Sequence, residues 1–345
     1  METVVVIANW NGKEFLKECL NSLKLQTYHN FKTIIIDNGS TDGSFSFLKE
    51  NYYEAEIIKL EKNTGFAHAN NLAIRKAFED KETKYIITLN NDTKTDPGYL
   101  KNLISCAKRH PEAGSFQPKV INFYDKNIID SVGVLIYLDA SAINRGQKEI
   151  DNGQYDDEEE IFGASASAAL YTREALERIK LPGGDYFDSD YFAYYEDVDL
   201  AWRLRLDGFS SYYCPDAKVY HVHSATGKNY SPFKSFHIHR NQYYNIIKNL
   251  PFCFMLRALA FMPVRYSFQV YSILRKKGPA AKLSENAGKG GFIKLMSKSW
   301  WQVLQNLPIL LKKRRFIQQN KKIKNSEAKV WLKKYKADFN KMIFN

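Results

Sequence analysis

Four short apolar segments in the first 90 residues, each followed by polar or glycine residues, constrain the fold more than any other feature of the sequence. They span residues 4–8, 33–36, 56–60 and 85–89. Segments with a helical spacing of apolar residues separate them, at 14–25, 44–50 and 67–78. Strands that alternate with helices predict an α/β fold with a mainly parallel sheet. Ligands of such sheets bind at the carboxyl ends of the strands, so the residues after each strand are the candidates for chemistry.

The residues that follow the second and third apolar segments are candidates for binding a nucleotide. Asp37 directly follows 33–36, and its carboxylate can accept the N3–H of a uracil or thymine ring. Asn63-Thr64-Gly65 precedes a predicted helix, where Gly65 permits a close backbone approach and the helix N-terminus offers N–H groups to a diphosphate. An Asx-type turn at Asp37 and a plain helix N-cap at Asn63 or Thr64 are the alternative interpretations.

The residues after the fourth apolar segment suit a metal ion. Asn90-Asn91-Asp92 supplies one carboxylate, and Mg²⁺ or Mn²⁺ between two phosphates needs only one or two carboxylates from the protein. We therefore expect Asp92 to be a metal ligand, with an Asn/Asp turn as the alternative. His221 is a second candidate ligand, although single histidines are more often structural or exposed.

Three carboxylates at the start of a predicted helix are candidates for a general base. Glu196, Asp197 and Asp199 fall within four residues. The dipole of the helix is expected to lower their pKa and to keep one of them ionised, as a general base requires. The alternative is the acidic first turn of an ordinary helix, because acidic residues are common there.

Charge is divided unevenly along the chain. Residues 240–345 contain 23 Lys and Arg against three acidic residues, whereas residues 1–239 contain 27 against 35. Such a basic region is expected to meet an anionic surface, either a membrane or a nucleic acid. No nucleic-acid recognition module is visible in the sequence, so we expect no nucleic-acid partner beyond the nucleotide donor.

Features of the basic region favour a membrane. Residues 252–274 are rich in large apolar side chains but contain Arg257, Pro263 and Arg265, which suits a helix that lies in a membrane interface. Trp300-Trp301 and the four basic residues 312–315 add an aromatic anchor and attraction to anionic lipids. A helical cap packed on the rest of the chain is the alternative.

The four cysteines are far apart, with neither a C-x-x-C pair nor the spacing of a zinc site. We therefore expect reduced packing residues in a cytosolic protein.

Taken together and in order, the motifs resemble those of the family 2 glycosyltransferases with the GT-A fold, and among them the rhamnosyltransferase-like proteins of bacterial polysaccharide assembly. The resemblance extends from residue 3 to about residue 245 and rests on residues 7–12, 36–44, 63–71, 89–93, 187–188 and 192–203. It implies a Rossmann-like catalytic domain at 1–245. From its composition, we expect the remaining residues, 246–345, to form a helical, basic region that either associates with a membrane or packs on this domain.

The resemblance also implies a role for each motif. The residues expected to bind the donor are Ala8, Asn9, Trp10, Asp37, Asn63, Gly65, Asn70, Asn90 and Asn91. Among them, Trp10 is expected to stack on the pyrimidine and Asp37 to accept its N3–H. Asp92 and His221 are the expected ligands of Mg²⁺ or Mn²⁺, although Asn90 departs from the family's Asp-x-Asp pattern. Asp197 is the expected catalytic base, with Glu196 beside it.

The activity that the resemblance implies is inverting, metal-assisted transfer of a sugar from a nucleotide-diphosphate donor to a hydroxyl of a glycan or of a polyprenyl-diphosphate-linked acceptor. The subfamily favours dTDP-rhamnose, with UDP-hexose or UDP-galactofuranose as alternatives. A sugar-phosphate nucleotidyltransferase fits less well, because residues 9–13 are a poor match to a triphosphate loop. An inactive glycan-binding module is a further alternative. The expected location is the cytoplasm, peripherally on the inner face of the cell membrane.

Overall fold

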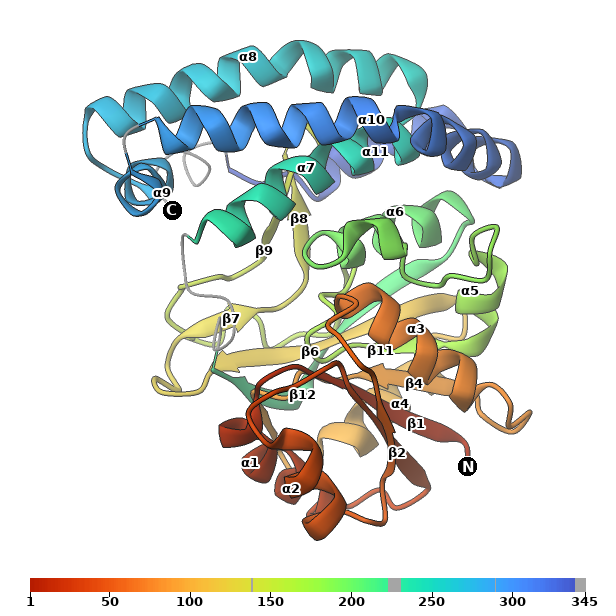
Figure 1. Cartoon of the computed structure of the whole chain (residues 1–345). Helices are drawn as coiled ribbons and strands as arrows, with labels where there is room; N and C mark the ends of the chain where they lie inside the picture. Colours follow the sequence, from red (N-terminus) through yellow and green to blue (C-terminus); the bar gives the residue numbers. More distant parts are fainter. Residues whose placement is uncertain (138, 223–230, 289, 339–345) are drawn as a thin grey trace.

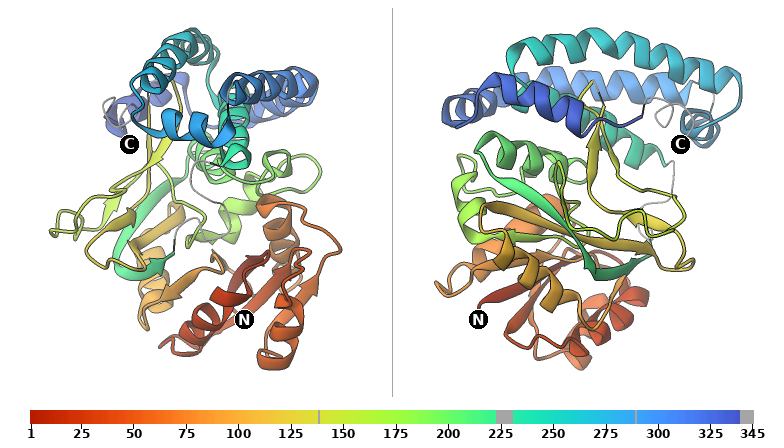
Figure 2. Two further views of the ribbon diagram at one scale, coloured as in Figure 1. Left: turned by 60° about the vertical axis from the view of Figure 1, so that its left-hand side comes forward. Right: turned by 180° about the vertical axis from the view of Figure 1, so that it is seen from behind.

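The computed structural model describes residues 1–137, 139–222, 231–288 and 290–338. A mixed sheet carries helices on both faces, and a layer of long C-terminal helices lies beyond one of these faces (Figure 1). Seen from the side and from behind, this layer lies at the opposite end of the molecule from the first two helices (Figure 2).

The central sheet has the order β10-β12-β6-β11-β4-β1-β2-β3. Its strands are β1 (Thr3–Asn9), β2 (Phe31–Asp37), β3 (Glu56–Lys59), β4 (Tyr85–Thr88), β6 (Ala113–Asn122), β10 (Glu159–Glu160), β11 (Leu170–Thr172) and β12 (Ser210–His221). β1 is parallel to both β2 and β4, and β12 is parallel to β6, whereas β11 is antiparallel to its two neighbours. Shorter strands complete the fold: β5 (Thr93–Thr95), β7 (Ile129–Ser131), β8 (Val134–Ile136) and β9 (Ala142–Asn144). The predicted α/β fold with a mostly parallel sheet is confirmed.

The central residues of β1 and β2 are apolar on both faces because helices cover both sides of the sheet there. Val5 and Ile7 of β1 pack in a core with α1 (Lys13–Lys24) and α4 (Tyr99–Arg109). Val4 and Val6 point the other way, toward α3 (Phe66–Ala77), α5 (Arg173–Arg178) and α6 (Glu196–Leu206). The predicted helices at 14–25, 44–50 and 67–78 are present as α1, α2 (Ser44–Asn51) and α3.

The C-terminal helices pack on the part of the chain that precedes them. They are α7 (Pro232–Asn249), α8 (Phe252–Leu274), α9 (Pro279–Ala287), α10 (Gly291–Asn320) and α11 (Asn325–Lys334). Trp202 of α6 shares an apolar core with Tyr244 of α7, Leu310 of α10 and Trp331 of α11. The domain boundary that we expected after residue 245 falls inside α7, which is continuous from Pro232 to Asn249.

A buried ionic network connects α7 and α10 to Asp188 and to Asp199 of α6. Lys248 of α7, which has no exposed surface, pairs with Asp188 and with Asp199, at 2.8 Å from Asp199 Oδ1. Lys313 of α10 lies 2.6 Å from Asp188 Oδ1, and Arg314 Nη1 donates to the carbonyl of Leu250 at 2.7 Å. Two of the four basic residues at 312–315 therefore bind the protein itself, which corrects the prediction that this cluster as a whole attracts lipid.

Within the described part of the chain, no helix has both the length and the apolar character that crossing a bilayer requires.

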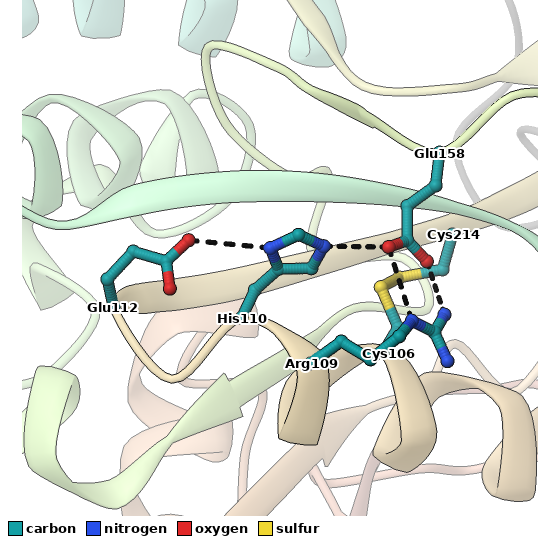
Figure 3. Close-up of a disulfide and its surroundings, with 6 residues drawn as sticks. All are labelled: Cys106, Arg109, His110, Glu112, Glu158 and Cys214. Atoms are coloured by element: carbon teal, nitrogen blue, oxygen red, sulfur yellow. Dashed lines mark hydrogen bonds and ion pairs between the residues drawn. A yellow bond between two sulfur atoms is a disulfide. The ribbon is translucent and has the colours of Figure 1, made fainter.

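Cys106 of α4 and Cys214 of β12 form a disulfide (Figure 3). The prediction that all the cysteines are reduced is therefore wrong for this pair. The two residues are 108 positions apart, and only the packing of α4 on β12 brings their Cα atoms to 6.3 Å. Beside them, His110 Nε2 lies 2.7 Å from Glu158 Oε1, which also binds Arg109 (Figure 3). Disulfides are rare in reducing compartments, so this bond weighs against our reasoning from cysteines to a cytosolic protein.

Candidate active site

The carboxyl ends of β1, β2 and β4 bring three of the expected donor-binding residues into one chain of hydrogen bonds. Asn9 and Asp37 are partners in the parallel register, and Asn9 Nδ2 donates to Asp37 Oδ1 at 3.2 Å. Asn91 Nδ2 donates to Asn9 Oδ1 at 2.7 Å. A Cβ atom on Gly12 would lie 1.9 Å from Asn91 Nδ2, so a glycine is needed at that position.

The other carboxylate oxygen of Asp37 has no partner in the part of the chain that the structure describes. This Oδ2 atom is buried, and a buried polar atom without a hydrogen bond costs about 1–3 kcal/mol. The site therefore suits a donor that the chain does not itself supply, such as a ring N–H.

Trp10 lies directly after β1 and is 40% exposed. Its loop is tied to the Asp37 loop, because Asn11 N donates to Ser40 Oγ at 3.0 Å and Thr41 N donates to Asn11 Oδ1 at 2.8 Å. An accessible indole held beside the Asp37 loop can stack on a flat ring. Ala8 packs against the α3 core, which leaves its backbone as the part that could contact a donor.

The loop before α3 is held by the chain itself. Asn63 Oδ1 accepts from Asn38 Nδ2 at 3.1 Å and from Gly65 N at 2.9 Å. Gly65 has φ +89°, and a Cβ atom there would lie 2.5 Å from the carbonyl oxygen of Phe192.

The first turn of α3 meets the same carbonyl. Ala67 N donates to Phe192 O at 3.2 Å, and Asn70 Nδ2 donates to Phe66 O at 2.9 Å within the helix. In this structure the close approach at Gly65 is to the backbone of Phe192 and not to an open site for a diphosphate, which corrects the role that we expected for this helix N-terminus.

Asp92 and His221 come together at the ends of β4 and β12. Asp92 Oδ1 lies 3.2 Å from His221 Nε2, and Asn90 Nδ2 lies 3.4 Å from the same nitrogen. Asp130 Oδ2 lies 2.7 Å from His221 Nδ1 and so fixes the ring from its other side. Asp92, His221 and Asp130 are all largely buried.

The electrostatics of this group suit a cation. Burial opposes protonation of His221, but the charges of Asp92 and Asp130 outweigh it and raise the pKa of His221 to about 10. The excess negative charge at the site thus draws a positive charge to Nε2. The described residues hold no ready cluster of three or more His, Cys, Asp or Glu ligands, because Asp130 binds the nitrogen that points away from Asp92. An ion here would need further ligands, which phosphates and water can supply.

Glu196 and Asp197 occupy the first turn of α6. Asp197 Oδ1 accepts from Val198 N at 2.8 Å and its Oδ2 accepts from Ala166 N at 3.3 Å. Burial raises the pKa of Asp197, although these N–H groups lower it in part. Burial and the neighbouring Asp197 together raise the pKa of Glu196 well above its ordinary value. The expectation that the helix dipole would lower the pKa of the first-turn carboxyls is wrong for these two, because burial outweighs the dipole.

The segment that contains Ala166 and Ser167 connects the loop after β4 to Asp197. Asn90 N donates to Ser167 O at 2.8 Å, and the neighbouring Ala166 donates to Asp197. Asp199, the third expected carboxylate, is wholly buried and binds Arg203 Nε at 2.8 Å and Lys248. It is therefore a structural residue.

The loop before α6 has an unusual backbone. Phe192, Tyr194 and Tyr195 have φ of 65°, 67° and 71°, a left-handed conformation that side chains other than glycine rarely adopt. Buried Asn241 of α7 supports this loop, because its Nδ2 donates to the carbonyls of Tyr194 at 2.6 Å and of two other loop residues. Strained backbone that its surroundings hold in place is typical of functional sites.

Sequence reasoning missed Asp130, Asn38 and Asn241. Asp130 and Asn241 lie in segments without a recognisable motif, and their roles depend on contacts with residues at least 47 positions away. Asn38 lies within the 36–44 motif, but its contact with the 63–65 loop forms only when the sheet brings the two loops together.

Comparisons with known proteins identify the family of the chain. The model of the family described as Glycosyl transferase family 2 matches residues 4–180, just over half of the chain. An N-acetylglucosaminyl-diphospho-decaprenol L-rhamnosyltransferase of Mycobacterium tuberculosis is 28% identical over 263 residues, which cover 70% of this chain and 82% of that protein.

Two solved structures share the fold. S. aureus TarS in complex with UDP is 18% identical, with a TM-score of 0.52 over 93% of this chain and 89% of that chain. The mannosyltransferase PcManGT from Pyrobaculum calidifontis, in complex with GDP-Man and Mn²⁺, is 16% identical, with a TM-score of 0.51 over 92% and 85%. Matches of this coverage extend into the helices after residue 245, so these helices are part of the shared fold. The chain belongs to glycosyl transferase family 2 and is a glycosyltransferase with the GT-A fold.

Proposed function

We propose that this glycosyltransferase moves rhamnose from dTDP-rhamnose to a hydroxyl of a polyprenyl-diphosphate-linked acceptor, with inversion at the anomeric carbon. The observation that carries the proposal is the arrangement of three groups at one edge of the sheet: the unpartnered oxygen of Asp37, the Asp92–His221 pair and the buried carboxylate of Asp197. The name of the mycobacterial relative supports this sugar and this acceptor. A UDP-hexose or UDP-galactofuranose donor, or a glycan acceptor, would use the same groups.

The residues of the chain divide the work of the reaction. Trp10 and Asp37 hold the pyrimidine, and Asn9 and Asn91 fix the Asp37 carboxylate. Asp197 takes the proton of the acceptor hydroxyl while its oxygen attacks the anomeric carbon. The bond to the diphosphate breaks on the opposite face and its electron pair leaves with the nucleotide. This single displacement inverts the configuration and needs no covalent nucleophile.

Asp92 and His221 would hold a divalent cation. Bound there, the cation stabilises the negative charge that develops on the leaving diphosphate. One carboxylate and one imidazole favour Mn²⁺ over Mg²⁺, because Mg²⁺ is held in proteins mainly by oxygen ligands. The far ring nitrogen of His221, Nδ1, donates a hydrogen bond to Asp130, and this bond orients the ring for this role.

Asp92→Ala and His221→Ala are each expected to remove the gain in dTDP affinity that Mn²⁺ produces, because each deletes one protein ligand. Titration calorimetry with dTDP and with UDP, with and without Mn²⁺, measures that gain and compares the two bases. Asp157→Ala, which removes an exposed carboxylate, is the control and should bind as the wild type does. Unchanged Mn²⁺ dependence in both site variants would mean that Asp92 and His221 are structural.

We further propose that the protein lies peripherally on the cytoplasmic face of the membrane. Exposed Arg257, Arg275, Lys276 and Lys277 on and after α8 support this. The full chain is expected to sediment with phosphatidylglycerol vesicles at low salt, less so as salt increases because exposed charges are screened over about 8 Å at physiological ionic strength, and not with phosphatidylcholine vesicles. Replacing Lys276 and Lys277 together by Glu should weaken sedimentation. No sedimentation, or equal sedimentation with both lipids, would contradict the proposal.

A further inference from the structure

An apolar groove on the C-terminal helical layer has no part in the site described above. It is a depression of about 450 Å³, open to solvent, between Tyr266 of α8 and one side of α10, where Phe292, Met296, Trp300 and Trp301 line it. Ser297 is its polar lining residue. Pockets that bind small molecules have volumes of about 300–1,000 Å³ and are lined mainly by apolar and aromatic side chains.

The rim of the groove leaves large apolar side chains in contact with solvent. Ile293 is 70% exposed and Trp301 is 63% exposed. Soluble proteins seldom expose neighbouring apolar side chains of this size unless the surface binds something. The arrangement therefore calls for an apolar occupant.

The charge around the groove calls for an occupant that is also anionic. Residues 252–320 contain 13 Lys and Arg and one acidic residue, Glu285. Lys294 and Lys298 of α10 are exposed and alternate with the lining residues along the helix. Lys298 Nζ lies 5.0 Å from the ring centroid of Phe236 on α7. Both lysines belong to α10, the helix that lines one side of the groove and packs against α7.

Aromatic contacts connect the groove to the loop before the general base. Phe192 stacks on His237 of α7 with ring centroids 5.3 Å apart, and His237 meets Phe236 at 5.2 Å. Phe236 packs against Phe292 and Met296, which line the groove. Only α7 therefore separates the groove from the loop that positions Asp197, and Figure 1 places α9 and the start of α10 on the same side as the start of α7.

We propose that this groove binds the isoprenoid chain of the lipid-linked acceptor, with Lys294 and Lys298 beside its diphosphate. The inference rests on the proposed function, since it assumes a polyprenyl diphosphate acceptor. A chain anchored one helix away from Asp197 presents its sugar toward the catalytic edge. The occupant is a single acceptor lipid and not the bilayer as a whole.

The test uses the full chain and farnesyl diphosphate, a soluble isoprenoid diphosphate, with inorganic diphosphate as the headgroup alone. Tryptophan fluorescence or calorimetry measures binding. Farnesyl diphosphate should bind at least tenfold more tightly than inorganic diphosphate. Trp301→Glu and Ile293→Glu should each remove that difference, because each places a negative charge in the apolar groove. Val330→Glu alters a 57% exposed side chain of α11, outside the groove, and should leave binding unchanged.

Several outcomes would overturn the inference. Equal affinity for the two diphosphates would mean that only the headgroup is bound. Binding that both groove variants retain would place the ligand elsewhere. A wild-type dimer that Trp301→Glu converts to a monomer, without isoprenoid binding, would make a second copy of the chain the occupant. Nucleotide binding with Mn²⁺, measured on the same samples, separates the two proposals. If the wild type does not bind nucleotide, the proposed catalytic function is contradicted. If Trp301→Glu binds nucleotide as the wild type does, the defect of this variant is confined to the groove.

Discussion

Asp197→Asn is expected to lower the rate of sugar transfer by about 10²–10⁴-fold, the usual contribution of a general base, and to leave nucleotide binding unchanged. The amide cannot take a proton from the acceptor hydroxyl, but it can keep the contact of the carboxylate with the N–H of Val198. Single-turnover transfer from dTDP-rhamnose or a UDP-sugar, with nucleotide affinity measured in parallel, separates the chemical step from binding.

Glu196→Gln is the matched control. Burial and the neighbouring Asp197 raise the pKa of Glu196 well above its ordinary value, which favours the neutral form of Glu196 beside an ionised Asp197. A neutral amide therefore replaces a neutral acid, and most of the activity should remain. If Glu196→Gln lost as much activity as Asp197→Asn, or if Asp197→Asn turned over as the wild type does, Asp197 would not be the sole base.

The rate of sugar transfer should depend on pH through the ionisation of Asp197. Burial raises the pKa of Asp197, so its base form is lost at a higher pH than the ordinary pKa of an Asp would give. The wild-type rate should decline on the acid side at a correspondingly higher pH than an exposed Asp would give, and Asp197→Asn should lack this limb.

The first half of the sheet could be predicted from sequence because its signals are local. β1, β2 and β4 are apolar on both faces and end at once in polar residues, so their periodicity and their loops identify them. β6 lacks this signal although it is buried along almost all of its length. It contains Gln117, Pro118 and Lys119, and the polar side chains are satisfied only by distant partners: Gln117 accepts from Ser165 N, and Lys119 pairs with Asp151. No local pattern predicts such a strand.

Some residues of the candidate site could likewise be predicted from local signals, whereas others depend on long-range contacts. Trp10, Asp37 and Asp92 follow strands, so their places at the carboxyl edge could be expected. The contact between Asp92 and His221 required the pairing of β12 with β5 and β6, which bring together residues 129 positions apart. Gly65 was recognised as a point of close approach, but the approaching backbone, Phe192, could be identified only in the folded chain.

The basic tail shows why charge alone was ambiguous. Net charge counts Lys248 and Lys312 alike, yet the first has no exposed surface and the second lies in solvent. The membrane and packing interpretations therefore apply to different residues of the same helices, with the buried cations serving the fold and the exposed ones available to an anionic surface.

Lys248→Met is expected to lower the free energy of unfolding by about 1–3 kcal/mol, because buried Asp188 and Asp199 lose their shared cation but keep Lys313 and Arg203 as partners. Lys312→Met, on an exposed position of α10, should change it by no more than about 0.5 kcal/mol. Urea unfolding followed by circular dichroism compares the two variants. If Lys248→Met is as stable as Lys312→Met, the ionic network does not hold the C-terminal helices to the catalytic part.

The pH dependence of this stability provides an independent check. Burial opposes ionisation of Asp188, but Lys248 and Lys313 outweigh it and hold the pKa of Asp188 below its ordinary range. A lowered folded-state pKa contributes stability that is complete above the unfolded-state value of about 3.9 and declines as the pH falls below it toward the folded-state pKa. The wild type should therefore lose stability below about pH 4. In Lys248→Met the pKa of Asp188 should rise toward its ordinary value, so acidification below about pH 4 should narrow the difference in stability from the wild type. A gap that stayed constant with pH would mean that Lys248 stabilises the fold by packing and not by its charge.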